Sequence, residues 1–404
     1  MNKVELLAPA KDLNKAKVAI DYGADAVYVG GKNFSLRSRA SNFSIEDLIE
    51  LKEYAKKHNV KVYVTTNIIF HDDDFVGIKE YLKTLEKIGI DGIILSSLSL
   101  LSICKDVAPK LERHISTQLS TNNSNTINVL KIWGADRVVL AREASIDNIE
   151  DIKYKTDLPL EVFIHGGMCS NYSGRCTLSN RMTIRDANRG GCAHSCRWKY
   201  KIFDNGELIS KEDCPLSMSS KDLRAVEFIP KLLDMGIASL KIEGRMKSEY
   251  YIAQVVKTYR SLIDEYYEKK EINKERLEYY KNELIKAENR PSDDGFLSGN
   301  MNNEKNLYGI NGAGVTHDYV AYVKAYDERR SLALIEVKNK FNLGDKLEIF
   351  GPEIDNYIFE NALMFDIDWN LVTSANKPTE LLYLRSPIPL KKGDMIRMVH
   401  ENDN

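Results

Sequence analysis

The sequence contains no long hydrophobic run. None of its apolar stretches approaches the roughly 18 residues that a helix needs to cross a bilayer. The amino-terminal segment MNKVELLAPAKD enters a strand-like pattern directly, without the apolar region that is typical of a signal peptide. We therefore expect a cytoplasmic protein that has no membrane partner.

The sequence also lacks an excess of charge of either sign. Its 57 basic and 59 acidic side chains leave a formal net charge of −2 at pH 7. A chain with this balance has no global positive field for nucleic acid, so RNA binding would depend on a local basic patch. Hydrophobic residues make up 43% of the 404 residues, which is enough for a sizeable core and for more than one domain.

Cysteine is scarce and unevenly distributed. Only six residues are cysteine, and four of them, Cys169, Cys176, Cys192 and Cys196, lie within 28 residues with the spacing C-x6-C-x15-C-x3-C. Cytoplasmic thiols stay reduced, so this group indicates a metal site or redox chemistry and not disulfides. The first pair is further apart than in the usual zinc knot. The spacing alone leaves an iron–sulfur cluster, zinc, or separate free or redox-active thiols as alternatives.

Short apolar runs alternate with amphipathic stretches along the first 250 residues. The runs that predict strands are 4–9, 26–31, 60–66, 92–97, 114–120, 137–142, 160–166 and 239–244, with 216–220 as an extra or competing candidate. Helical periodicity lies between them, for example over 44–59, 75–89 and 123–134. Such alternation indicates parallel strands with crossover helices. We predict an α/β fold, a TIM-type (β/α)₈ barrel over residues 1–255, with a cysteine-rich insert at about 167–215.

The pattern changes after the barrel. Residues 256–310 predict a helical and turn-rich linker, in which the charged stretch 269–290 is expected to be a solvated helix. Period-two alternation then predicts strands at 320–328, 332–340, 345–351, 380–386 and 395–400. These strands predict a small C-terminal antiparallel β-barrel over residues 311–404, with an accessory role.

Active sites of (β/α)₈ barrels lie at the carboxyl ends of the strands. The polar residues at these ends are Tyr28, Thr66, Asn67, Gln118, Arg142, Glu143, His165 and Glu243. All of them are expected to face the same mouth, beside the cysteines. The sequence contains no GxGxxG or GxxxxGK[ST] motif that would indicate a nucleotide-binding sheet instead.

The segment EVFIHGGMCSNYSGRCTLS at 161–179 closely resembles the signature of the collagenase-like peptidases, family thirty-two of the unassigned peptidases. The resemblance continues through 190–200, 218–225, 239–251 and 295–300, and so covers most of the chain. The chain is most similar to the branch that forms 5-hydroxyuridine at the tRNA wobble position. The resemblance therefore implies an oxygen-independent RNA hydroxylase with tRNA as partner and prephenate as oxygen donor.

The resemblance also assigns residues. It implies a 4Fe-4S cluster on Cys169, Cys176, Cys192 and Cys196, and it sets Cys104 and Cys214 aside. His165 and Glu243 are the candidates for proton transfer. The candidates for substrate binding are Arg142, Arg175, Arg197, Arg245, Lys247, Tyr172, Asn67 and Gln118. Arginine suits carboxylates and phosphates because it pairs with both bidentately, and an aromatic ring such as Tyr172 suits an unstacked base.

Three alternatives remain open. The family name implies a peptidase, but the sequence has neither HExxH nor GxSxG, and Cys169 with His165 is the dyad that the matched segment offers. A second branch of the family implies an rRNA cytidine hydroxylase. The third alternative is an RNA-binding factor that a metal stabilises. The sequence also leaves open a homo-oligomer or a paralogous partner.

Overall fold

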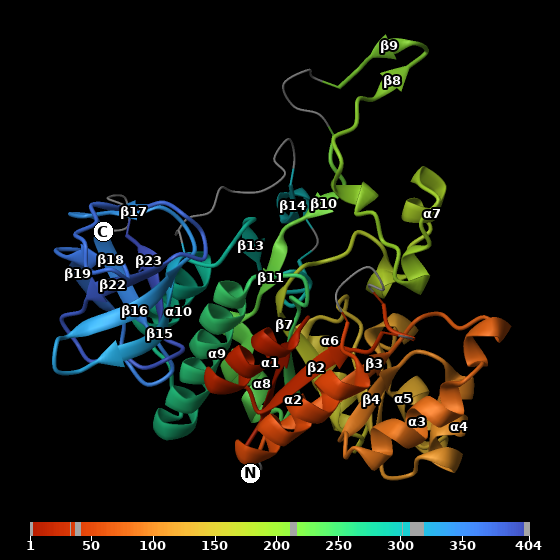
Figure 1. The fold of residues 1–404 in the computed structure, drawn as a ribbon. Helices are drawn as coiled ribbons and strands as arrows, with labels where there is room; N and C mark the ends of the chain where they lie inside the picture. The colour runs from red at the N-terminus through yellow and green to blue at the C-terminus, as the bar shows by residue number, and fades with distance from the viewer. Residues whose placement is uncertain are drawn as a thin grey trace.

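The computed structural model describes residues 3–32, 34–36, 42–210, 216–300, 302–307 and 319–399. Cys214 and the predicted start of the C-terminal domain at residue 311 lie outside these ranges. The described chain forms a closed barrel, an irregular segment over one end of the barrel, and a second, antiparallel sheet beside it (Figure 1).

Eight parallel strands close into a barrel, as the alternating pattern predicts. They are β1 (Glu5–Pro9), β2 (Ala26–Gly30), β3 (Lys61–Thr66), β4 (Gly92–Leu95), β5 (Glu112–Ile115), β6 (Arg137–Val139), β7 (Leu160–Gly166) and β12 (Ser239–Ile242). Strand β12 pairs in parallel with both β7 and β1, which closes the sheet. The prediction of a TIM-type barrel is confirmed. The competing candidate at 216–220 lies outside the barrel, where β10 (Ser219–Ser220) pairs with β14 (Asn306–Leu307).

The fifth strand lies earlier than the predicted range 114–120. It starts at Glu112, a polar residue that carries no strand signal but whose carboxylate accepts hydrogen bonds from Lys61 and His114. It ends at Ile115 because the side chain of Ser116 accepts a hydrogen bond from the amide of Gln118 and caps a 3₁₀ turn. Gln118 therefore lies in the loop after the strand.

Helices cover the outside of the barrel (Figure 1). They are α1 (Leu13–Asp21), α2 (Ile45–Lys57), α3 (Ile78–Lys87), α4 (Leu98–Val107), α5 (Ser124–Ile132), α6 (Ile146–Tyr154), α8 (Ile229–Asp234) and α9 (Glu249–Lys269). Capping side chains start several of them; at α2, Ser44 and Asp47 form a reciprocal capping box. Of the helices in the described ranges, none combines the length and apolar content that a bilayer crossing needs.

Two helices connect the barrel to the C-terminal region. Helix α9 continues past residue 255, where the sequence places the end of the barrel, and it buries Tyr251 and Tyr259 against the barrel. Helix α10 (Lys274–Ile285) confirms the predicted helix, but Tyr280, Glu283 and Leu284 are buried, so only part of it is solvated. The assignment of residues 256–310 to a separate linker stays a prediction.

The C-terminal region forms a seven-stranded antiparallel sheet. In spatial order its strands are β19 (Tyr357–Glu360), β18 (Lys346–Phe350), β23 (Met395–Met398), β15 (Tyr319–Asp327), β16 (Leu332–Val337), β22 (Leu381–Arg385) and β20 (Met364–Phe365). The short strands β17 (Phe341–Asn342) and β21 (Ser374–Ala375) pair separately. The sheet buries one apolar face in its own core, and its shape is a half-barrel.

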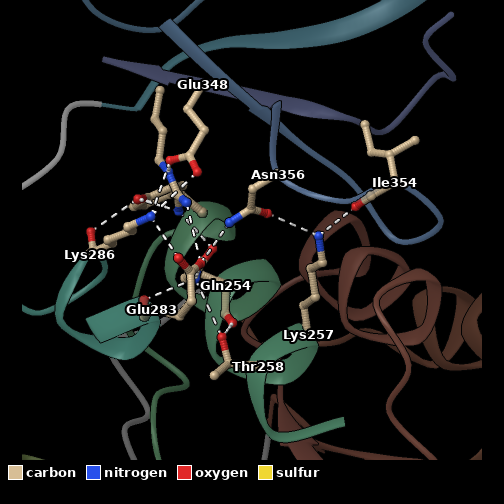
Figure 2. Close-up of polar contacts among 10 residues, drawn as sticks. Gln254, Lys257, Thr258, Glu283, Lys286, Glu348, Ile354 and Asn356 are labelled. Carbon is tan, nitrogen blue, oxygen red and sulfur yellow. Dashed lines mark hydrogen bonds and ion pairs between the residues drawn. The ribbon is translucent and has the colours of Figure 1, made fainter. Parts of the chain in front are cut away.

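A buried ionic network, here called the junction network, joins this sheet to α9 and α10 (Figure 2). Arg397 of β23 is 0% exposed, and it donates from Nε to Glu348 at 2.7 Å and from Nη1 to Gln254 at 2.8 Å. The carboxylate of Glu283 in α10 accepts hydrogen bonds from Gln254 at 2.8 Å and from Lys286 at 2.6 Å. Because its charges are paired and hydrogen-bonded, the network fixes the sheet against both helices.

Candidate active site

The cysteine-rich insert lies over the carboxyl ends of the barrel strands (Figure 1). It follows β7 directly and contains little regular structure. Its short elements are η3 (Tyr172–Gly174), α7 (Leu178–Met182), η4 (Ala187–Arg189), η5 (Ser195–Arg197), and the projecting hairpin of β8 (Phe203–Asp204) and β9 (Glu207–Leu208). Hydrogen bonds within the insert and contacts with loops of the barrel hold its described part in place.

Glu143, in the loop after β6, anchors the first half of the insert. Its carboxylate accepts hydrogen bonds from the amide of Ser173 at 2.6 Å and from the hydroxyl of Ser173 at 2.5 Å. Ser173 lies between Cys169 and Cys176 and has a φ of 47°, a left-handed conformation that serine rarely adopts. Two charge-assisted hydrogen bonds offset the cost of this conformation and hold the loop over the barrel.

Two asparagines position the first two thiols. The backbone amide of Asn171 donates to Cys169 Sγ at 3.5 Å, and its side chain donates to Cys176 Sγ at 3.2 Å. Asn188 holds the backbone of Cys176 at two points, accepting from its amide at 3.1 Å and donating to its carbonyl at 2.9 Å. Donors aimed at sulfur favour the thiolate form and tune metal–thiolate sites.

The four thiols differ in exposure: Cys176 is buried, Cys169 and Cys196 are half-buried, and Cys192 is exposed. Burial raises the pKa of Cys169, the amide of Asn171 and the charge of Arg142 lower it, and the thiols of Cys196 and Cys176 raise it, so both thiols lie within electrostatic reach of Cys169. Within the described ranges, no three Cys, His, Asp or Glu side chains are close enough together to hold a metal ion. The thiol chemistry fits a soft metal centre, and the joint ligation by all four cysteines stays a prediction.

His165, near the end of β7, is enclosed by α9. It is 2% exposed, its Nδ1 lies 3.3 Å from the hydroxyl of Tyr259, and the rings of Tyr251 and Tyr259 flank it. Burial lowers its pKa to about 3, and the positive charges of Lys247 and Arg224 act in the same direction. The imidazole is therefore neutral at pH 7. In the described structure no hydrogen bond joins it to a thiol.

Glu243 follows β12 and pairs with Arg142. The nitrogen–oxygen distance is 3.3 Å, and both side chains are largely buried. The guanidinium of Arg142 also lies 3.8 Å from the centre of the Phe163 ring, which holds it flat against the barrel interior. Gly166 has a φ of 104°, and a Cβ at this position would lie 2.2 Å from the carbonyl oxygen of Glu243. Only glycine therefore allows the close approach of the chain after β7 to the chain after β12. The pair lies at the predicted mouth.

Two predicted substrate-binding residues hold a loop instead of facing an open space. Arg245 is buried and donates to the hydroxyls of Ser35 and Thr65, both at 3.0 Å. Asn67 accepts a hydrogen bond from the amide of Leu36 at 3.3 Å. Both contacts tie the segment after β2 to the end of β3, so their role in substrate binding stays a prediction.

Three others lie where the insert meets the fifth and sixth strands. Arg175 donates from Nε to the carbonyl of Gln118 at 2.8 Å. The side-chain oxygen of Gln118 is buried and has no hydrogen-bond partner in the described part of the chain. Tyr172 is 50% exposed, and its hydroxyl accepts from Asn122 at 2.6 Å. These contacts leave the ring of Tyr172 accessible to a ligand.

The sequence did not reveal a group of charged residues beside Lys247. Lys247 lies 3.8 Å from Asp222, Arg290 lies 3.6 Å from Asp222, and Arg224 lies 3.8 Å from Glu288. Strand β11 (Asp222–Arg224) runs antiparallel to β7, and β13 (Ser292–Asp293) runs parallel to β11. These short strands carry no periodic signal, so no pattern in the sequence could bring residue 290 to this place.

Comparisons with known proteins agree with this architecture. Residues 11–307 match the profile of peptidase family U32, and residues 315–397 match the peptidase family U32 C-terminal domain. The chain is 44% identical over 403 residues to tRNA hydroxylation protein P1 of Bacillus subtilis, covering 98% of this chain and 94% of that protein. It is 37% identical over 367 residues to an uncharacterized protease of Methanocaldococcus jannaschii, covering 87% of this chain and 88% of that protein.

A third relative is larger. The 23S rRNA 5-hydroxycytidine C2501 synthase of Escherichia coli is 39% identical over 264 residues, which are 65% of this chain and 40% of that protein. The two family profiles together span most of the chain, and the match to the Bacillus subtilis protein runs almost from end to end. The protein therefore belongs to peptidase family U32, as the cysteine segment predicts.

Proposed function

We propose that this protein hydroxylates tRNA and forms 5-hydroxyuridine at the wobble position. The observation that supports it most is the anchored cysteine-rich insert at the barrel mouth, in a chain 44% identical to a protein named for tRNA hydroxylation. A tRNA substrate implies a cytoplasmic location. The homo-oligomer and the paralogous partner remain predictions.

The proposal includes a 4Fe-4S cluster held by Cys169, Cys176, Cys192 and Cys196. A bound cluster of this kind supplies one-electron transfer. The chain itself contributes the hydrogen bonds that Asn171 donates to two of the sulfurs. The contacts of Glu143 with Ser173 and of Asn188 with Cys176 keep the loop between these two thiols in one conformation.

We propose that the new oxygen comes from a second substrate, prephenate, and not from molecular oxygen. In the net reaction the hydroxyl group of the donor replaces the hydrogen at C5 of uridine, and that hydrogen ends on the donor carbon. The base loses two electrons and the donor gains them. Atoms and charges balance, and no further oxidant is needed.

The side chains at the mouth suggest which residues would transfer protons and which would contact the base. Glu243 is largely buried and held by Arg142 at the mouth, and we assign its carboxylate to accept or return a proton. His165 is buried and neutral, which gives it a weaker claim to this role. The half-exposed ring of Tyr172 is placed to stack on an unstacked base, as loop bases do on aromatic side chains.

The peptidase alternative has less support from the site. A cysteine peptidase needs a thiol hydrogen-bonded to a base. The hydrogen bond of His165 in the described structure is with Tyr259, and its low pKa makes it a poor base. The rRNA cytidine hydroxylase alternative rests on a relative of which the chain covers 40%.

Nucleoside analysis of tRNA tests the proposal. A strain that lacks this gene and every related gene should lose 5-hydroxyuridine and its derivatives, and the wild-type gene should restore them. Cys176→Ser should not restore them, whereas Cys104→Ala should, because Cys104 lies in the barrel core away from the insert. Unchanged 5-hydroxyuridine in the deletion strain would overturn the assignment.

A further inference from the structure

Three cationic side chains converge beside the cysteine-rich insert. Lys247 follows β12, Arg224 ends β11, and Arg290 precedes β13; we call them the cationic triad. They surround two carboxylates, Asp222 and Glu288. All five side chains are largely buried, with side-chain exposures between 8% for Asp222 and 22% for Lys247.

The charges in this group are poorly paired. Its ion pairs measure 3.6 to 3.8 Å, which is longer than a charge-assisted hydrogen bond. Among the described residues, Lys247 donates one hydrogen bond, to Asn289 at 3.2 Å, and lies 4.9 Å from the centre of the Tyr251 ring, and Arg290 donates one hydrogen bond, to Ser219 at 3.4 Å. The guanidinium of Arg224 donates none to the described residues, and its Nε is buried. Unpaired buried donors are costly, so donors arranged in this way favour a ligand that accepts them.

The group also carries excess positive charge, because three cations face two carboxylates. The field is visible in neighbouring groups. Burial lowers the pKa of Lys247, and the charges of Arg290 and Arg197 lower it further, against the effects of Asp222 and Glu243. The charges of Lys247 and Arg224 likewise add to the effect of burial on His165. An anion at this place would offset the repulsion among the cations.

The triad adjoins the proposed reaction centre. A Cβ on Gly167 would lie 3.4 Å from Nη2 of Arg197 and 3.9 Å from Oδ1 of Asp222. Gly167 is followed after one residue by Cys169, the first cysteine of the insert. Asp222 is 5% exposed, and its Oδ1, which lies 3.6 Å from Arg290, has no hydrogen-bond partner among the described residues.

We infer that Arg224, Lys247 and Arg290 form a binding site for an oxyanion at the barrel mouth. Carboxylate and phosphate share the chemistry that the triad recognises, since guanidinium pairs bidentately with both. The site itself follows from the geometry, and its assignment to a substrate rests on the proposed function. A carboxylate of the oxygen donor and a backbone phosphate of the RNA are the two sources.

Thermal unfolding of the full-length protein with malonate or inorganic phosphate tests the site. A ligand that binds the folded state raises the Tm, so at least one of these anions should raise it at millimolar concentration. Arg224→Gln should weaken this response at least about tenfold, because it removes the strongest unpaired donor. Arg329→Gln, at an exposed arginine of the C-terminal sheet, is the matched control and should respond as the wild type does.

A folding defect is distinguished by the Tm without anion. Arg224 makes no hydrogen bond with the described residues, and its ion pair with Glu288 is long at 3.8 Å, so Arg224→Gln should change this Tm only slightly. A wild-type Tm that neither anion changes would overturn the inference. So would an Arg224→Gln variant that retains the full response.

Competition with a tRNA anticodon stem-loop separates the two sources. If the triad binds backbone phosphate, the stem-loop should displace malonate; if it binds a donor carboxylate, both should bind together. The binding assay requires no hydroxylation. Anion binding without a change in tRNA nucleosides would therefore contradict the proposed function alone, and loss of 5-hydroxyuridine without anion binding would contradict the site alone.

Discussion

The junction network and the cationic triad are both buried charged groups, and they differ in how well their charges are paired. At the junction, Arg397 and Lys286 contact Glu283 and Glu348 at 2.6 to 3.4 Å (Figure 2). At the mouth, the corresponding contacts are 3.6 to 3.8 Å and one cation is in excess. Close pairing indicates a structural role, because each buried charge is neutralised and hydrogen-bonded by its partner. Poor pairing beside a candidate active site indicates a role in binding.

Arg397→Met should have the largest effect on stability. It leaves Glu283 and Glu348 buried with too little positive charge, which should lower the free energy of unfolding by about 3 to 5 kcal/mol. Urea-induced unfolding measures this change. Arg224→Gln should change the same quantity by less than about 1 kcal/mol, because its guanidinium has no hydrogen bond to lose. If both variants lost the same free energy of unfolding, the distinction between the junction network and the cationic triad would be wrong.

The pH dependence of stability should reflect the burial of His165, to which the charges of Lys247 and Arg224 add. The folded-state pKa of about 3 lies below the unfolded value of about 6.5, so the unfolded chain binds the proton first. The stability is fully present above pH 6.5 and falls as the pH falls toward 3, by about 2 kcal/mol between pH 7 and pH 5. His165→Gln should remove this part of the pH dependence.

Arg224→Gln removes the smaller of the two charges that add to burial, so the fall in stability should end at a slightly higher pH and remain nearly unchanged between pH 7 and pH 5. Arg329→Gln is the control, since this exposed arginine of the C-terminal sheet should leave the dependence unchanged. Unfolding curves for His165→Gln that remain parallel to those of the wild type from pH 7 to pH 5 would show that His165 does not titrate as described.

The smallest expected change in stability comes from the titration of Lys257, near the junction network. Burial lowers its pKa to about 8, although its ammonium donates to the carbonyl of Ile354 at 2.8 Å and to Asn356 at 3.2 Å (Figure 2). Because the unfolded chain keeps this proton to higher pH, stability should rise by about 1 kcal/mol from pH 7 to pH 9. Lys257→Met should abolish the rise. A rise of equal size in that variant would assign it to other groups.

The barrel was predictable because its strands have a local signal. Parallel strands that are buried on both sides are apolar throughout, and glycine-capped helices separate them. The prediction was wrong where polar residues enter the barrel. Glu112 and His114 of β5 pair with each other. Because both are polar, the apolar pattern placed the start of this strand too late in the sequence.

The site was predictable only where its chemistry is concentrated in the sequence. The cysteines and their family signature identified the insert. The contacts that position it are not local in sequence: Glu143 of the barrel holds Ser173, and Asn188 within the insert holds Cys176, by hydrogen bonds that no periodicity encodes. No local pattern predicts the cationic triad either, because tertiary contacts alone bring Arg224 close to Lys247.

The central claim is that the four clustered cysteines of this chain hold an iron–sulfur cluster that serves RNA hydroxylation. Iron and acid-labile sulfide analysis of the full-length protein, purified without oxygen, tests it most directly. We expect a brown protein with about four irons per chain, lost in Cys176→Ser and retained in Cys104→Ala. A colourless protein that contains stoichiometric zinc would contradict the account.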